Sequence, residues 1–288
     1  MQTEVNTALG VYSSMFNDPV TVRILFRFAT TAPNGTALGA NSLAQSNYVF
    51  YAVAWNSFLS ALIADKKTSN DNTAVANLPG SALATNLDPT SANGRAVGLS
   101  TAGTMNPDSS VGGGTLDGIV TLNSGKNFDF DRSNGITAGF YDGLRSIEHE
   151  VDEVLGMGSI LPATTDFTGS TAFRPTDLYR YSAPGTRSLS VAAASSYFSI
   201  NGGTTNLVGF NQTAGGDYGD WLSNVGCPAL VQDAFSCTDQ IADISATSPE
   251  GVNLDVIGYD LAVPEPGSVV LVLSGAGLLA LGRRRVRA

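Results

Sequence analysis

The 288-residue chain has one histidine, two cysteines and few basic residues. A single histidine excludes a metal site built on two or three imidazoles. Cys227 and Cys237 stand too far apart for a CxxC redox motif and have no second histidine or further cysteine with which to form a structural zinc site. Lys and Arg total 15 against 25 Asp and Glu, which gives a net charge of -10 and argues against a nucleic-acid partner.

The two cysteines leave two interpretations open. In an oxidising compartment, a disulfide between Cys227 and Cys237 would close a short loop and contribute about 2 to 3 kcal/mol of stability. Two buried free thiols are the alternative. Neither interpretation implies redox catalysis.

Hydrophobic residues make up 43% of the chain, which is enough for a substantial core and excludes wholesale disorder. The length fits one large domain or two small ones. Thirty-two glycines, long Ser/Thr/Asn/Ala stretches and few lysines are typical of a loop-rich extracellular protein.

Hydrophobic periodicity predicts the first elements. Helical spacing of apolar residues indicates a helix over residues 5–16, and apolar alternation indicates a half-buried strand over residues 20–28. After a loop, we expect a strand over 48–53, one or two helices over 58–78, a polar connection over 80–117, and a short strand over 118–122.

The last 26 residues combine Pro264-Glu265-Pro266, an apolar run over 269–281, and an arginine cluster over 283–287. This tail resembles the PEP-CTERM sorting signal. The resemblance implies cleavage by an exosortase and export to the envelope or extracellular matrix of a Gram-negative bacterium, alongside exopolysaccharide. It also implies a secretory signal, which residues 1–16 lack, so we expect the true start to precede Met1 or the signal to have been removed.

The apolar run is short for a membrane span. Thirteen helical residues reach about 20 Å, against roughly 30 Å for the hydrocarbon core. Arginines reaching the cytoplasmic headgroups would nevertheless allow the tail to serve as a transient transmembrane anchor.

The only histidine lies in an amphipathic segment that ends at Gly156, a suitable residue for a helix C-terminus. His149 and Glu153 are four residues apart, hence one turn apart on the same face, and Glu150 lies about 100° round the helix. Two metal ligands and a general base would fit this spacing. The apolar stripe of the predicted helix consists of Leu144, Ile147, Val151, Val154 and Leu155.

A second interpretation of this helix involves no metal. Glu148, Glu150, Asp152 and Glu153 would then form its solvated face, and Arg145 would pair with Glu148 or His149. A Ser-His-Asp triad is disfavoured, because the chain has no GxSxG nucleophile elbow.

The segment resembles the active-site helix of the zincin metallopeptidases, HExxH, and its metzincin form HExxHxxGxxH. His149, Glu150 and Gly156 match. The preceding context is also similar, with residues 118–122 as an edge strand followed by a loop and a Tyr-Asp pair. The chain departs from the family at Glu153, which replaces the second histidine, and at Ser159, which replaces the third ligand.

The resemblance implies that His149 binds the metal and that Glu150 polarises the attacking water. Glu153 would take the second ligand position, because carboxylates also bind zinc in peptidases. The blocks HEVDEVLG, RPTDLYRYSAPG, YFSINGG and GGDYGDW are similar to blocks of exported PEP-CTERM metallopeptidases. On that resemblance, Asp177 is the first candidate for the third ligand, and Asp217 or Asp220 is the alternative. Zn²⁺ is the expected ion, with Mn²⁺ or another divalent ion as alternatives.

We therefore expect an α+β protein with a twisted mixed sheet behind a zincin-like helix. The expected parts are an α+β domain over 1–160, a loop-rich portion over 161–262 packed on it, and the sorting signal over 263–288. The predicted function is metal-dependent hydrolysis of a peptide or protein substrate. The alternative is a non-catalytic matrix protein whose acidic, Ser/Thr/Gly-rich body associates with exopolysaccharide.

Overall fold

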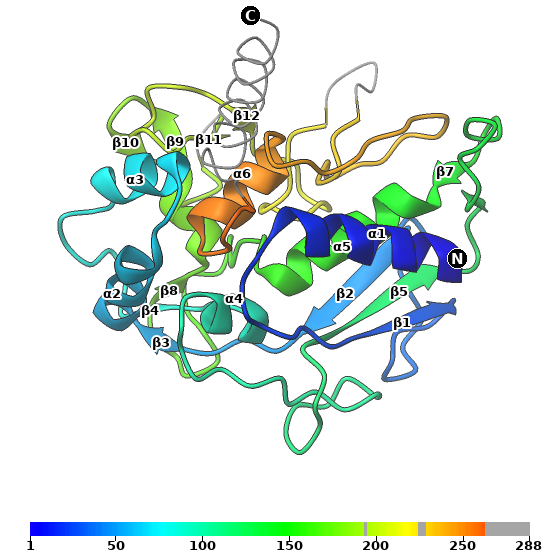
Figure 1. The fold of residues 1–288 in the computed structure, drawn as a ribbon, viewed down its shortest axis with the longest axis horizontal. Helices are drawn as coiled ribbons and strands as arrows, with labels where there is room; N and C mark the ends of the chain where they lie inside the picture. Colours follow the sequence, from blue (N-terminus) through cyan, green and yellow to red (C-terminus); the bar gives the residue numbers. More distant parts are fainter. Residues whose placement is uncertain (193–194, 224–228, 263–288) are drawn as a thin grey trace, which may run out of the picture.

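A three-stranded mixed sheet forms the base of the fold (Figure 1). It is described here from a computed structural model that places residues 1–192, 195–223 and 229–262. The central strand β5 (Gly118–Asn123) pairs in parallel with β1 (Ile24–Ala29), beginning at Ile24 opposite Gly118. On its other side β5 pairs with the antiparallel edge strand β2 (Ala44–Tyr48).

The burial of the strands follows their sequences. All six residues of β5 are buried, as expected for an apolar strand with a neighbour on each side. The edge strand β2 has the polar sequence AQSNY and is half-buried along its whole length. The strand therefore places polar side chains next to helix α5.

Helix α5 (Gly143–Leu155) packs on β2 and β5, and α1 (Gln2–Met15) packs against α5 (Figure 1). The Asp142 side chain caps the start of α5 by accepting hydrogen bonds from the backbone N–H groups of Leu144 and Arg145. Gly156 ends the helix with a φ of 124°, a conformation that side chains with a Cβ rarely adopt.

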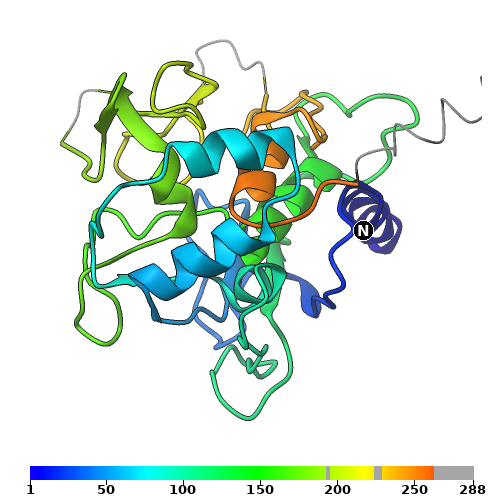
Figure 2. The ribbon, with the colours of Figure 1, turned by 60° about the vertical axis from the view of Figure 1, so that its left-hand side comes forward.

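Smaller elements complete the structure around this base. Helix α3 packs against α6 (Figure 2). The remaining helices are α2 (Trp55–Asp65), α3 (Ser69–Ala76), α4 (Ser91–Ala96), α6 (Pro249–Val256) and the 3-10 helix η1 (Pro175–Tyr179). The remaining strands are β3 (Val53–Ala54), β4 (Asn86–Leu87), β6 (Phe128–Asp129), β7 (Tyr141–Asp142), β8 (Ala172–Phe173), β9 (Arg180–Ala183), β10 (Thr186–Arg187), β11 (Tyr197–Phe198) and β12 (Val208–Gly209).

One hydrophobic core runs through both halves of the body. Ile147 of α5 belongs to the same buried cluster as Phe198, Trp221 and Leu254. Trp221, in the GGDYGDW block, is fully buried, with its ring stacked on Phe198 at a centroid distance of 5.6 Å. Residues after 160 thus help to hold α5 in place.

The α+β class with a mixed sheet is confirmed, as are the helices before residue 16 and after residue 143. The half-buried first strand is confirmed with a later start, whereas two other expectations about strands were wrong. The first strand begins at Ile24 and not at residue 20; the second occupies Ala44–Tyr48 and not 48–53; and residues 118–122 lie at the centre of the sheet and not at its edge. The polar sequence of β2 hid the true edge strand, because it lacks apolar alternation.

Two further expectations concern residues near or beyond the described parts. Cys237 is disulfide-bonded, and Cys227, the only other cysteine of the sequence, lies outside the described residues. The expected transmembrane segment over 269–281 also lies outside them. Among the helices that are described, none combines the length and apolar character needed to cross a membrane.

Candidate metal centre

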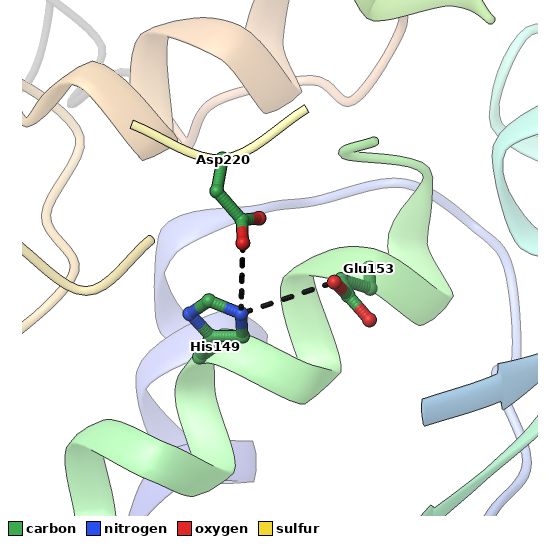
Figure 3. A group of neighbouring side chains, drawn as sticks. All are labelled: His149, Glu153 and Asp220. Carbon is green, nitrogen blue, oxygen red and sulfur yellow. Dashed lines mark ion pairs between the residues drawn. The ribbon is translucent and has the colours of Figure 1, made fainter. Parts of the chain in front are cut away.

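His149, Glu153 and Asp220 converge beside α5, where Asp220 is buried and the other two are partly buried (Figure 3). The Nε2 atom of His149 lies 3.8 Å from Oε1 of Glu153 and 3.8 Å from Oδ2 of Asp220. One potential ligand atom from each side chain lies within 4.8 Å of the other two. The helix supplies two of these groups, and a loop more than 60 residues further along the chain supplies the third.

The histidine ring is held in one tautomer. Its Nδ1 lies 3.0 Å from the backbone carbonyl of Val231, which can only accept a hydrogen bond, so Nδ1 carries the proton. The lone pair of Nε2 is then directed toward Glu153 and Asp220. A neutral imidazole fixed through its other nitrogen is the usual form of a histidine that binds metal.

Arg145, one turn before His149 on α5, anchors the loop that carries Val231. Its Nε donates a hydrogen bond of 2.9 Å to the carbonyl of Leu230, and its guanidinium lies 3.6 Å from the carboxylate of Asp233. Arg145 therefore pairs with this loop, and not with Glu148 or His149 as the metal-free interpretation supposed. One helix thus supplies both a candidate ligand and the anchor of the carbonyl that orients it.

Polar neighbours orient the two carboxylates. Ser46 of the edge strand β2 donates a hydrogen bond to Oε2 of Glu153, which leaves Oε1 facing His149. Gln232 donates to Oδ1 of Asp220 at 2.9 Å, which leaves Oδ2 facing the histidine. The amide nitrogen of Gln232 also lies 3.3 Å from Nε2 of His149.

The glycine before Asp220 permits the loop to approach the end of α5. A Cβ at Gly219 would lie 2.5 Å from the Cα of Gly158 and the backbone nitrogen of Ser159. No side chain fits there without displacing backbone, so this contact requires glycine. The GGDYGDW block therefore contributes a carboxylate, a close backbone contact and a core tryptophan.

Glu150 lies beside the three groups and is only 6% exposed. Burial raises its pKa well above the ordinary value, and the negative charges of Glu153, Asp220 and Asp217 raise it further. Burial likewise raises the pKa of Glu153 to about 8, although His149 lowers it. The pKa of Asp220 is raised by burial and then by Asp217.

This accumulation of carboxylates fits a bound cation. Among the described residues, neither Glu153 nor Asp220 forms an ion pair with a lysine or an arginine. A neutral imidazole with two carboxylates balances the charge of one divalent ion. The nitrogen and oxygen donors suit Zn²⁺ and also other divalent ions such as Mn²⁺.

The group opens into a cavity of about 890 Å³. The edge strand β2 and the loop before it line this cavity, together with α5 and the loops over 215–220 and 231–236. A cavity of this size accommodates a short peptide segment or a comparable ligand. We refer to it below as the cleft.

Asp177 does not join this group. It caps η1, where it accepts hydrogen bonds of 2.7 Å from Ser159 Oγ and 3.0 Å from the backbone N–H of Arg174. Of the two alternatives, Asp220 is the carboxylate that lies next to His149, whereas Asp217 accepts a hydrogen bond from the backbone of Gly219.

The interpretation of the acidic residues as a solvated helix face was wrong. Glu148 and Asp152 are fully buried, and Glu150 is nearly so. Sequence reasoning also missed Ser46, Gln232 and the carbonyl of Val231, because each comes from a segment without a recognisable motif.

Residues 262–287 match the PEP-CTERM protein-sorting motif. The chain is therefore an exported, envelope-targeted protein that an exosortase processes. No curated protein and no solved structure matches the chain.

Proposed function

We propose that the body is a metal-dependent peptidase that acts outside the cytoplasm. The convergence of His149 Nε2, Glu153 and Asp220 in one cleft, with Glu150 beside them, is the observation that carries this proposal. The bound divalent ion would polarise the scissile carbonyl and the attacking water. His149, Glu153 and Asp220 would hold the ion.

Glu150 would act as the general base and then as the general acid. Its carboxylate would accept a proton from the attacking water and return it to the departing amine. Glu150 lines the same cleft as the three candidate ligands. The low exposure of the group also limits exchange of this proton with bulk water.

The edge strand β2 would position the substrate. One edge of β2 pairs with β5, and residues of β2 line the cleft that also contains His149 and Glu153. An extended peptide can add to such a strand through backbone hydrogen bonds. This arrangement would hold the scissile bond over the candidate ligands.

For the tail, we propose a transient anchor in the inner membrane of a Gram-negative cell. The apolar run over 269–281 and the arginines after it support this. Expression with and without an exosortase tests it: the mature protein should be smaller and released from the membrane only when the exosortase is present. An identical mass and membrane fraction in both strains would contradict it.

Metal content tests the proposed site. The full chain should bind one equivalent of zinc or manganese, measured by elemental mass spectrometry after loading and desalting. His149→Ala, Glu153→Gln and Asp220→Asn should each lower the bound ion at least tenfold, because each removes a ligand. Asp177→Asn is the matched control and should retain it.

Hydrolysis of a mixed peptide library by the loaded wild type would then establish the activity. Absence of metal in every sample, or equal metal in all variants, would contradict the site. Metal binding without hydrolysis would contradict the peptidase proposal and favour the matrix-associated protein, which binding to exopolysaccharide would then test.

A further inference from the structure

A buried arginine lies in the wall of the cleft, at the end of the edge strand. Arg174 follows β8 and is 9% exposed. Its guanidinium carbon lies 4.3 Å from the ring centroid of Phe50 and 5.3 Å from that of Tyr48, the last residue of β2. All three residues line the cleft together with His149 and Glu153.

Tyr48 connects this arginine with the candidate metal centre. Burial raises the pKa of Tyr48 to about 12; Arg174 lowers it, whereas Glu153, Asp217 and Asp220 raise it. The Tyr48 ring lies 5.3 Å from the guanidinium carbon and lines the same cleft as Glu153 and Asp220. A ligand that extends along β2 past Glu153 would reach the guanidinium at the end of the strand.

The charge of Arg174 has no close carboxylate partner. Within the described ranges, it forms no ion pair, and its guanidinium makes one long hydrogen bond, from Nη1 to the carbonyl of Asp88 at 3.3 Å. Its Nε is buried without a partner. A guanidinium can donate two parallel hydrogen bonds to a carboxylate, and an unpaired buried donor is costly. The group is thus available for a ligand that supplies acceptors.

Aromatic side chains border the same position. Phe167 is 68% exposed and meets Phe50 edge-to-face with a centroid distance of 5.5 Å. The arginine therefore lies beside an apolar wall, where a desolvated ion pair is stronger than it would be in water. A small anion alone would leave this apolar surface uncovered, whereas a peptide would contact both.

We infer that Arg174 determines specificity by binding a carboxylate of the peptide substrate, from either an acidic side chain or a free C-terminus. This inference rests on the proposed peptidase function. The competing interpretation is structural, with Arg174 as the distant counter-charge of Asp88, whose two carboxylate oxygens are buried without hydrogen-bond partners. The experiment must separate these two roles.

Binding of three fluorescein-labelled octapeptides of one apolar sequence tests the inference by anisotropy. The first carries a central Glu and an amidated end, the second a central Gln and an amidated end, and the third a central Gln and a free C-terminal carboxylate. The full chain with Glu150→Gln serves as the receptor, so that hydrolysis does not interfere. At least one of the two peptides with a carboxylate should have a Kd about tenfold lower than that of the neutral peptide. A charge-assisted hydrogen-bonded pair provides a difference of this size.

Arg174→Gln should abolish that difference, and Arg174→Lys should retain only part of it, because lysine lacks the planar fork. Arg187→Gln is the matched control, since Arg187 also stacks on an aromatic ring, Tyr181, but does not line the cleft. Asp88→Asn should leave the peptide preference unchanged. If it removes the preference, the structural interpretation holds instead.

The outcomes distinguish the sources of the carboxylate and the two proposals. If only the first peptide binds more tightly than the neutral one, the carboxylate that Arg174 binds comes from an acidic side chain. If only the third peptide does so, the carboxylate is a free C-terminus. Equal or undetectable binding of all three peptides, or a preference that survives Arg174→Gln, overturns the inference. If the wild type hydrolyses library peptides without a carboxylate preference, only this inference fails; if the preference is present without hydrolysis by the loaded wild type, only the peptidase proposal fails.

Discussion

The two faces of α5 use the same residue types for different purposes. On the face toward α1 and the segment before α6, Asp152 accepts a hydrogen bond of 2.7 Å from Tyr12, and Glu148 accepts one of 3.1 Å from the backbone N–H of Ile244. On the cleft face, Glu153 and Asp220 meet each other and His149. The carboxylates of the first face fasten other segments to α5, whereas Glu153 and Asp220 each keep one oxygen directed toward His149, which leaves acceptors for a cation.

The largest effect that separates the two faces should come from Glu150. Glu150→Gln preserves shape but removes proton acceptance, so the rate of peptide hydrolysis should fall by about a thousandfold. The bound metal should remain at one equivalent, because Glu150 is not among the three candidate ligands. Rates measured on the best library peptide, beside metal content, check both statements. Loss of the ion in this variant would make Glu150 a ligand and contradict the assigned roles.

The opposite face should respond in stability and not in metal binding. The Tyr12 hydroxyl donates to the carbonyl of Glu148 and to the carboxylate of Asp152, and all three residues are buried. Tyr12→Phe leaves these acceptors without their donor and should lower the free energy of unfolding by about 2 kcal/mol. Urea denaturation monitored by circular dichroism measures this loss.

Metal content and peptide binding should be unchanged in Tyr12→Phe under conditions where it is folded. Unchanged stability with reduced metal binding would reverse the distinction between the faces. Ser14→Ala is a suitable control, because its side chain bonds only within α1 and is exposed.

Helix α5 was predictable from sequence because its information is local. The apolar stripe fixes its buried face, and Gly156 ends it. The spacing of His149 and Glu153 follows directly from helical geometry. The edge strand β2 was not predictable in the same way, because the sequence AQSNY becomes a strand only through pairing with β5 and packing on α5.

The choice of the third carboxylate shows more clearly what could not be predicted from the sequence. Asp177 and Asp220 are both buried aspartates, and the local sequence around each does not rank them. The choice depends on where loops far apart in the chain meet. The glycine before Asp220 was the available signal, since Gly219 permits the close backbone contact that brings Asp220 toward His149.

The smallest effect concerns a buried carboxylate outside α5. Asp255 of α6 accepts hydrogen bonds from Thr68 at 3.0 Å and Asn70 at 2.8 Å, but its other oxygen is buried without a partner. Burial, and then the charge of Asp71, raises the pKa of Asp255 to about 7 from an ordinary value of 3.8. Donors are thus present, but they do not fully offset the cost of burying the charge.

The sign of the pH effect follows from this raised pKa. Between about pH 4 and pH 7 the folded state holds a proton on Asp255 that the unfolded state has lost, so the contribution of Asp255 to stability decreases as the pH rises. Asp255→Asn removes this loss and should raise the free energy of unfolding by about 1 kcal/mol at pH 8, with little change near pH 4. Urea unfolding at both pH values, on metal-free protein, measures the difference. A gain of equal size at both pH values would show that the substitution acts through packing and not through the charge.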